Sequence, residues 1–382
     1  VTDPMGNETE YGYDVCDRLI EIRQYGEFEE ELTLDKELAE IQEHNREARV
    51  CQITRYDRDV SGQVTRVTDA LGREERYTYG KRGELLSKLD KDGYLTTYGY
   101  TKKGDINRIQ YADGREVRLS YNPLRQLEEL EDWLGLTRIE NDPLGRAVKV
   151  SYPEGEAVSY SYGKAGERTS LTYPDGRTVT YVYDELSRLT ELKDEERSIR
   201  YAYDAQGRLE EKRFPGGMTS RYAYDAQGRI ESLIHSDKEG ILDAYAYKYD
   251  ILGNKTAIEK QRRGLKEESG SYAYGYDTLG RLSSVTKDGT LLRSYAYDAF
   301  GNRTGLREGE RETRYTYNAL NQLVSLTDGE TTEKYAYDKR GNLTEHLRNG
   351  ALVNQYLYGA LNRLEKAVNG EGIEASYQYN GL

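Results

Sequence analysis

A nine-residue pattern returns along almost the whole chain and limits what the chain can fold into. Residues 201–209 read Tyr-Ala-Tyr-Asp-Ala-Gln-Gly-Arg-Leu, and residues 222–230 repeat them with only the last residue changed to Ile. Weaker copies run from Tyr11 to Tyr379, over most of this length 20 or 21 residues apart. Self-similarity at a short fixed period is typical of arrays in which each repeat packs on its neighbours. The sequence therefore predicts a single repeat array over residues 1–382.

Each repeat has the pattern of a β-hairpin. The two tyrosines of Tyr-x-Tyr lie on one face of a strand, because strand side chains alternate with period two. Asp or Asn at the first turn position with Gly at the fourth is typical of a type I turn, and a left-handed glycine then gives a bulged hairpin. At the other end of the repeat, Asp288-Gly289 and Asn349-Gly350 predict a second tight turn.

The predicted fold class is all-β: a coiled antiparallel β-hairpin repeat array, in the form of a shell or spiral sheet. An open sheet of more than about ten strands must curl, because the strand twist accumulates with one hand. Aspartate at a turn start has a structural role, since its side chain binds backbone amides further along the turn. The structural repeat positions that we expect to build the turns and the aromatic rows are Tyr183, Asp184, Tyr203, Asp204, Gly207, Tyr224, Asp225, Gly228, Tyr276, Asp277, Gly280, Tyr297, Asp298, Gly301, Tyr337, Asp338 and Gly341.

Two stretches depart from the period. Residues 27–50 contain no glycine and hold nine acidic residues against three basic ones, with Leu34, Leu38 and Ile41 on one helical side. This pattern predicts a short amphipathic helical insertion over residues 27–50, which either covers part of the sheet or binds a partner. The two repeats between Tyr224 and Tyr276 are longer than the others. They predict longer hairpins, or alternatively a binding loop.

Composition excludes several functional classes. The chain has 37 tyrosines but only three phenylalanines, so its apolar surface resides mainly in tyrosine rings. Its formal net charge of −13, with scattered Lys and Arg, argues against a nucleic-acid partner. No apolar run reaches the ~18 residues of a membrane helix, so no membrane span is expected. Cys16 and Cys51 form either one bridge or two unpaired thiols.

The sequence contains no recognisable catalytic or metal-binding pattern. His44, His235 and His346 each stand without a second ligand at metal-binding spacing. Nucleophile motifs, a P-loop and a dinucleotide-binding fingerprint are also missing from the sequence. We therefore expect a non-enzymatic chain with no catalytic residue, no cofactor and no metal site.

The motif Tyr-x-Tyr-Asp-x-x-Gly-Arg-Leu, as at residues 201–209, resembles the RHS/YD-repeat family over nearly the whole chain except residues 27–50. This family includes RHS polymorphic toxins, wall-associated YD-repeat proteins, B and C components of insecticidal toxin complexes, and teneurins. The resemblance implies a secreted or cell-surface β-shell that often encloses a C-terminal toxin or effector domain. The implied partner is the rest of the same polypeptide, including its C-terminal core, and we expect this chain to be a fragment of it.

One departure from the family pattern limits which functional residues can be assigned to this chain by resemblance. Family members with cargo carry a core motif of the type Asp-Pro-x-Gly-Leu-x-Gly-Gly and a self-cleaving aspartyl site after the repeats. Here Asp142-Pro143-Leu144-Gly145 is followed by Arg146-Ala147 and occupies an ordinary turn, so no protease residue is assigned. The sequence thus favours a structural shell segment, and the alternative is an adhesion or carbohydrate-binding wall in which stacked tyrosines hold sugars.

Overall fold

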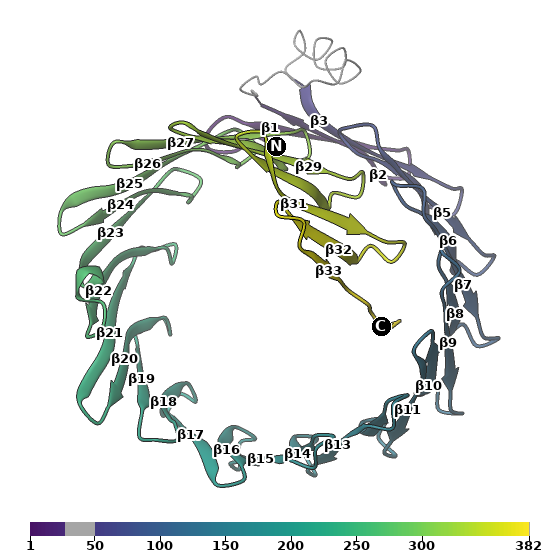
Figure 1. Ribbon diagram of the computed structural model, residues 1–382, viewed down its shortest axis with the longest axis horizontal. Coiled ribbons are helices and arrows are strands. Elements are labelled where there is room, and N and C mark those ends of the chain that lie inside the picture. Colours follow the sequence, from purple (N-terminus) through teal and green to yellow (C-terminus); the bar gives the residue numbers. More distant parts are fainter. Residues whose placement is uncertain (27–49, 382) are drawn as a thin grey trace. The chain divides into compact units, whose positions relative to one another are not determined.

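The computed structural model describes residues 1–26 and 50–381 as an antiparallel β protein (Figure 1). Within these residues there are 33 strands and one short 3-10 turn, η1 (Lys266–Glu268). The predicted all-β hairpin array is confirmed. The helix predicted over residues 27–50 falls on residues 27–49, outside the described residues, and Val50 already begins a strand.

The strands follow one another at short, regular intervals. The first part of the chain contains β1 (Glu8–Tyr13), β2 (Leu19–Tyr25), β3 (Val50–Arg58), β4 (Val64–Thr68), β5 (Glu74–Tyr79), β6 (Leu85–Leu89), β7 (Leu95–Tyr100), β8 (Ile106–Gln110), β9 (Glu116–Tyr121), β10 (Leu127–Asp132), β11 (Gly135–Asn141), β12 (Ala147–Ser151), β13 (Ala157–Tyr162), β14 (Arg168–Thr172), β15 (Thr178–Tyr183), β16 (Leu189–Asp194) and β17 (Arg197–Tyr203). The remainder contains β18 (Leu209–Arg213), β19 (Thr219–Tyr224), β20 (Ile230–Asp237), β21 (Gly240–Tyr249), β22 (Lys255–Arg262), β23 (Gly270–Tyr276), β24 (Leu282–Lys287), β25 (Thr290–Tyr297), β26 (Arg303–Glu308), β27 (Arg311–Tyr317), β28 (Leu323–Asp328), β29 (Thr331–Tyr337), β30 (Leu343–Arg348), β31 (Ala351–Tyr358), β32 (Leu364–Asn369) and β33 (Glu374–Ser376).

The chain divides into two compact units. Unit 1 comprises residues 1–118, 276–283 and 293–382, and unit 2 comprises residues 119–275 and 284–292. In unit 1 the meanders β1–β9 and β25–β33 pair each strand antiparallel with the next. In unit 2 the meander β10–β23 does the same. The prediction of one array over residues 1–382 stays a prediction.

Among the described residues, turns lie at both ends of the strands, and the two ends differ. We call the turn that follows the second tyrosine the front turn, as in Asp204–Gly207, and the turn at the opposite end of the strands the back turn, as in Tyr173–Gly176. In the front turn, the Gly207 amide donates to the Asp204 carbonyl over 3.0 Å, Gly207 has φ +81°, and the ladder register shifts at Tyr203. This is the predicted four-residue turn with a left-handed glycine and a bulge.

Two-residue back turns also follow the prediction. Asp288 and Gly289 have φ of +50° and +81°, and Asn349 and Gly350 have +49° and +81°. A type I′ turn requires positive φ at both central residues, and its twist matches that of the flanking strands. The longer repeats predicted after Tyr224 are present as the long strands β20, β21 and β22, followed by η1.

The strand faces differ in exposure. In β17, Ile199, Tyr201 and Tyr203 are half-buried on one face, whereas Arg200 and Ala202 on the other face are exposed. Few of the described side chains are fully buried. Most strand residues are only partly covered by the adjacent strands. The buried apolar residues are Val117, Leu130, Val179, Tyr272, Val285, Tyr315 and Ala360.

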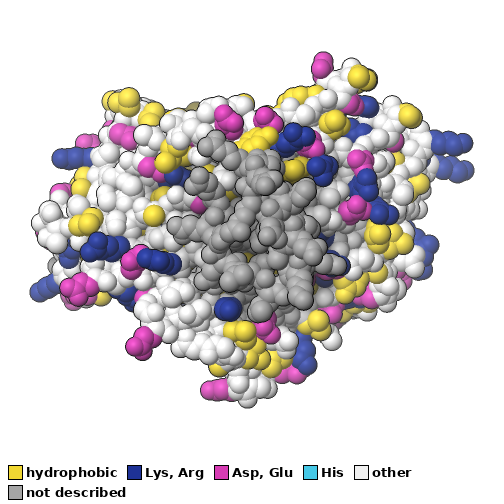
Figure 2. All heavy atoms as spheres, turned by 90° about the horizontal axis from the view of Figure 1, so that it is seen from above, with side chains coloured by type: hydrophobic (Ala, Val, Ile, Leu, Met, Phe, Trp, Pro, Cys, Tyr) yellow, Lys and Arg dark blue, Asp and Glu magenta, His cyan; other side chains and the backbone are white. Residues whose placement is uncertain are grey.

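The described surface carries both charge signs. Acidic, basic and hydrophobic side chains are interspersed on the face shown in Figure 2. No helix among the described residues has the length and apolar character needed to cross a membrane. Cys16 lies exposed in the front turn between β1 and β2 as a free thiol, and the side chain of Cys51 lies outside the described part of the chain.

Candidate functional site: the turn seam

In several repeats an arginine after the front turn links the repeat to the next one, and unit 2 shows the arrangement clearly. The Arg208 side chain donates through Nε to the Asp204 carboxylate over 2.7 Å. Its guanidinium lies over the Tyr224 ring, 4.5 Å from the centroid. The Tyr224 hydroxyl in turn donates to the Leu209 carbonyl over 2.8 Å. Aspartate, arginine and the tyrosine of the next repeat therefore hold adjacent hairpins together.

The tyrosine bond recurs along the chain. The second tyrosine of a repeat donates its hydroxyl to the carbonyl that opens the return strand of the preceding repeat. This bond is present at Tyr79, Tyr100, Tyr162, Tyr183, Tyr203, Tyr249, Tyr297, Tyr317 and Tyr337.

Asn141 shows which property the second-tyrosine position of a repeat requires. It occupies the second-tyrosine position of its repeat, and its side-chain amide donates to the Leu127 carbonyl over 2.9 Å. A shorter side chain thus supplies the same hydrogen bond without the ring. Satisfying that carbonyl is the shared property of the position, because an unpaired buried backbone group is costly.

The aspartate, glycine and tyrosine positions predicted from the repeat occur once in each hairpin, so they do not gather into one site. At the turn starts, each aspartate accepts backbone amides through Oδ1, and the closing glycines have positive φ. The aspartates are Asp184, Asp204, Asp225, Asp277, Asp298 and Asp338. The glycines are Gly207, Gly228, Gly280, Gly301 and Gly341. The tyrosines Tyr183, Tyr203, Tyr224, Tyr276, Tyr297 and Tyr337 are half-buried.

These contacts change the protonation equilibria of the repeat. Hydrogen bonds from the backbone amide and then the guanidinium of Arg188 hold the pKa of Asp184 below its ordinary value. Burial raises the pKa of Tyr203 and of Tyr224 above the ordinary tyrosine value. Both shifts favour the charge states in which the aspartate accepts and the tyrosine donates its hydrogen bond.

A second kind of contact joins hairpins that are far apart in the sequence within unit 1. We call it the turn seam: front turns of the C-terminal repeats, from Asp298 to Asn362, lie against back-end residues of the N-terminal repeats, from Gly26 to Arg115. Its centre is Arg340, whose side chain is only 6% exposed. Arg340 forms ion pairs with Asp92 at 2.8 Å and with Asp90 at 3.4 Å.

Arg340 also has neutral partners. Its Nη1 donates to the Gly359 carbonyl over 2.9 Å, and the guanidinium lies 4.6 Å from the centroid of the Tyr94 ring. The backbone amide of Lys339 donates to Asp92 over 3.2 Å. Carboxylates, a carbonyl and a ring thus surround a cation that is largely removed from water, an arrangement that compensates for its desolvation.

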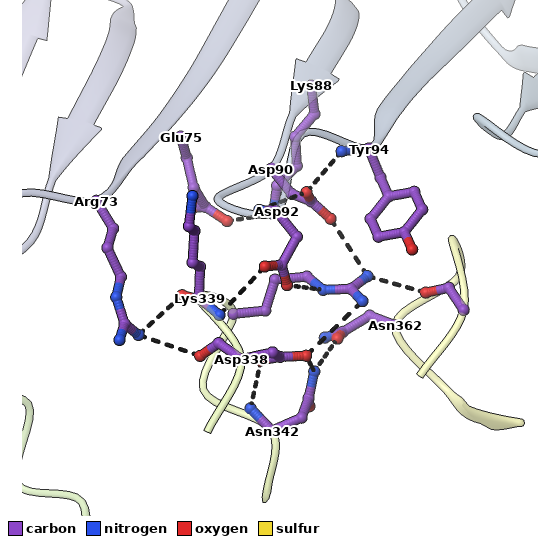
Figure 3. Close-up of polar contacts among 12 residues, drawn as sticks. Arg73, Glu75, Lys88, Asp90, Asp92, Tyr94, Asp338, Lys339, Asn342 and Asn362 are labelled. Carbon is purple, nitrogen blue, oxygen red and sulfur yellow. Dashed lines mark hydrogen bonds and ion pairs between the residues drawn. The ribbon is translucent and has the colours of Figure 1, made fainter. Parts of the chain in front are cut away.

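Several further contacts continue the seam. Arg73 donates to the carbonyls of Asp338 and Lys339 over 3.1 and 3.3 Å (Figure 3). Next to the seam turns, Arg115 pairs with Glu365 of β32 at 2.6 Å. Near the other end, Gln52 donates to Asn321 over 2.7 Å.

A glycine allows close packing at the same seam. A Cβ on Gly26 would lie 2.6 Å from the Phe300 ring and 2.8 Å from the Ala299 methyl. The turn that contains Phe300 can therefore approach the end of β2 only because residue 26 lacks a side chain.

The seam was not predicted from the sequence, although a local signal is present. In the repeat of residues 335–343, Asn342 stands where Arg208 stands in its repeat, and the arginine is displaced to position 340. Arg340 still reaches the carbonyl of the next repeat, as Arg208 does with Asp225 over 3.5 Å. An arginine within the turn, in place of the one after it, indicates that its side chain makes an additional contact. The sequence does not identify the residue that it contacts.

A smaller polar cluster lies on β29 and β30. The carboxylate of Glu333 accepts from the Tyr335 hydroxyl over 2.6 Å, lies 3.0 Å from His346 Nε2 and pairs with Arg348 at 2.9 Å. The Tyr335 hydroxyl, and then Arg348 and His346, hold the pKa of Glu333 below its ordinary value, whereas burial and the bond to Glu333 raise the pKa of Tyr335 to about 12.

The same arrangement on β5 and β6 indicates a structural role for this cluster. There Tyr77 donates to Glu75 over 2.7 Å, and Lys88 pairs with Glu75 at 3.0 Å.

The other histidines lie elsewhere. His235 Nδ1 lies 2.8 Å from the Ser220 hydroxyl on the neighbouring strand, and His44 falls outside the described residues. Among residues 1–26 and 50–381, no group of three or more His, Cys, Asp or Glu is arranged to hold a metal ion.

Comparison with known proteins points to one family. The model of the family described as Teneurin YD-shell matches residues 187–304 and 244–382. The model described as RHS Repeat matches residues 58–93, 142–178 and 165–199. A comparison with curated protein sequences finds no match.

Solved structures share the fold. The crystal structure of TcdB2-TccC3-TEV matches 94% of this chain with a TM-score of 0.71 and 15% identity, over 21% of its own length. The crystal structure of TcdB2-TccC3 matches 95% with a TM-score of 0.68 and 16% identity, over 22% of its length. A Tc holotoxin pore structure from Photorhabdus luminescens matches 95% with a TM-score of 0.66 and 15% identity, over 23% of its length. This chain therefore spans about a fifth of the length of the solved chains it resembles.

Proposed function

The chain belongs to the RHS/YD-repeat shell family, and on this premise we propose that it is a non-enzymatic wall segment of a larger secreted or cell-surface polypeptide. In this role it encloses or presents the other parts of that polypeptide, including a toxin or effector domain. The repeats supply the wall, and the chemistry belongs to the enclosed part.

The turn seam is the observation that carries this proposal. Residues between 247 and 269 positions apart in the sequence contact one another through side chains of unit 1. A flat repeat array would leave its turns solvated, because each repeat of such an array contacts only its neighbours. Docking of late turns on early ones gives the wall a second set of contacts, as a protein that retains a guest requires.

The repeat contacts also support a structural role for the tyrosines. The Tyr224 ring has one face under a guanidinium and its hydroxyl bonded to a backbone carbonyl. A sugar that stacked on this face of the ring would have to displace the guanidinium. The carbohydrate-binding alternative stays a prediction, for which tyrosine-dependent binding to a glycan array is the test.

Limited proteolysis of the longer polypeptide tests the wall function. With the seam intact, the enclosed part should resist a protease that digests the same part when it is produced without the repeats. Arg340→Glu should increase its cleavage, because the substitution places a third carboxylate beside Asp90 and Asp92. Arg314→Glu is the matched control, because Arg314 is exposed and pairs only with Glu312 among the described ion pairs. Equal cleavage with and without the repeats would refute the proposal.

A further inference from the structure

Three cations gather around η1, the short 3-10 turn that the longer repeats add to unit 2. Lys260 and Arg262 lie on β22, and Lys287 ends β24. The amine of Lys260 lies 3.9 Å from the centroid of the Tyr272 ring, and that of Lys287 lies 5.8 Å from the same centroid. Tyr272 itself is only 8% exposed. Two lysine amines are therefore held beside one buried ring.

Hydrogen bonds fix η1 to the sheet at this place. The Tyr272 hydroxyl donates to the Glu268 carbonyl over 3.1 Å. Lys287 Nζ donates to the Glu267 carbonyl. The ring, one of the amines and the backbone of η1 thus hold one another in position, and a site that is ordered in advance loses less entropy when a ligand binds.

The carboxylates of this region are paired with Arg262 instead of the lysines. Arg262 donates through Nε to Asp243 over 3.1 Å and through Nη1 to Glu268. Among the ion pairs of residues 1–26 and 50–381, none joins Lys260 or Lys287 to a carboxylate. Burial lowers the pKa of Lys260 below its ordinary value. Glu268 opposes this shift, and the positive charges of Arg262 and Lys287 add to it.

A related cluster in unit 1 has the carboxylate that this one lacks. On β5 and β6, Lys88 Nζ lies 5.9 Å from the centroid of the Tyr77 ring. Glu75 accepts from the Tyr77 hydroxyl over 2.7 Å and pairs with Lys88 at 3.0 Å. One carboxylate there neutralises the amine that lies over the tyrosine. Beside Tyr272 the described chain supplies two amines and no carboxylate in contact with them, so an anion from outside the chain fits this place.

We propose that Lys260 and Lys287 bind the phosphate group of a small phosphorylated molecule beside the Tyr272 ring. Two ammonium groups are neutralised by two negative charges, and a phosphate monoester carries nearly two at neutral pH, whereas a carboxylate carries one. Lysine binds phosphate as a compact point charge, through three donors that adapt to the phosphate oxygens. The proposal goes beyond the wall function, because it assigns a ligand to the longer repeats.

Isothermal titration calorimetry of the 382-residue chain with inorganic phosphate tests the proposal. Phosphate should bind at one site per chain. Acetate, titrated at the same ionic strength, should bind more weakly by about 10-fold or more, because a monoanion leaves one ammonium group unpaired. Glycerol 3-phosphate distinguishes a phosphate monoester from free phosphate, and it should bind at least as tightly as inorganic phosphate does.

Substitutions locate the binding. Lys260→Gln and Lys287→Gln should each weaken phosphate binding by about 10-fold or more, since each removes a charged donor. Lys260→Arg should retain most of the affinity, because it keeps the positive charge. Circular dichroism spectra and melting curves show whether each variant folds. If Lys260→Gln does not fold, Lys287→Gln and Lys260→Arg carry the test.

Lys255→Gln is the matched control. Lys255 is an exposed lysine on the same strand, and its amine lies 4.7 Å from the centroid of a different ring, Tyr247. The substitution removes the same charge from another lysine that lies over a tyrosine. The control should therefore bind phosphate like the wild type.

Three results would overturn the proposal. The first is a wild type that binds neither phosphate nor glycerol 3-phosphate. The second is phosphate binding that Lys260→Gln and Lys287→Gln weaken no more than Lys255→Gln does, because the anion would then bind elsewhere. The third is a site that takes acetate as tightly as phosphate or rejects glycerol 3-phosphate, because it would then not recognise a phosphate monoester.

Discussion

Arg340→Ala removes the side chain that connects the most partners in the turn seam, and we expect it to release the C-terminal hairpins from the N-terminal ones. Truncating one partner of a buried ion pair costs about 3–5 kcal/mol, because the other charge stays desolvated. Asp90 retains its hydrogen bonds from the amides of Asp92 and Tyr94, whereas Asp92 loses its cation. We therefore expect the lower end of the range, about 3 kcal/mol.

Segment-resolved amide hydrogen exchange measures this effect where it occurs. A loss of about 3 kcal/mol corresponds to roughly 100-fold faster exchange in β29–β32 if these strands open through loss of the seam. The hairpins of unit 2 should keep their protection, because repeats depend mainly on their neighbours. Arg208→Ala serves as the control, since its partly exposed pair with Asp204 should cost only about 1 kcal/mol.

A double-mutant cycle identifies the partner. Asp92→Asn should weaken the seam less than Arg340→Ala does, and the double variant should be little worse than Arg340→Ala alone. The resulting coupling energy should be about 1–3 kcal/mol, as for side chains in direct contact. Additive effects of the two substitutions, or unchanged exchange in β29–β32 on loss of Arg340, would refute the seam as a stabilising contact.

Three more predictions concern the repeat itself. Tyr224→Phe should lower the free energy of unfolding by about 1 kcal/mol in urea titrations, because the Leu209 carbonyl loses its donor; unchanged stability would contradict the bond. Ser187→Gly should raise it by about 0.5–1 kcal/mol, since Ser187 has φ +60°, whereas Ala205→Gly, at a position without positive φ, should lower it. Spectrophotometric titration of tyrosinate should show a large group of tyrosines above the ordinary pKa of about 10, because burial raises the values of Tyr335 and of the second tyrosines such as Tyr224. A tyrosine whose pKa is raised in the folded state stabilises the fold fully below its unfolded pKa, so stability should be lost as pH rises from about 10 towards 12; a single titration step at about 10 in the folded chain would contradict this.

The sequence indicated some features of the repeat but not their partners. An arginine after the turn glycine, as at Arg208, recurs often enough to be visible, yet only the structure shows that it lies over the tyrosine of the next repeat. Asn141 is a clearer case, because it breaks the tyrosine pattern but keeps the hydrogen bond to Leu127. A sequence pattern records residue type, whereas the structure shows that the position requires a hydrogen-bond donor.

The sequence by itself determined the local units: the strands, the four-residue turn at Asp204–Gly207 and the type I′ turns at Gly289 and Gly350. These depend on side-chain alternation and on φ preferences within a few residues, which the order of amino acids specifies directly. Only the tertiary structure decided that Arg340 contacts Asp92, 248 residues away. It also decided that the third residue of some front turns is covered, whereas Leu144 at the same position is exposed. Strand twist accumulates with one hand, so a contact between turns this far apart in the sequence depends on many strands together and is not specified by a local pattern of residues.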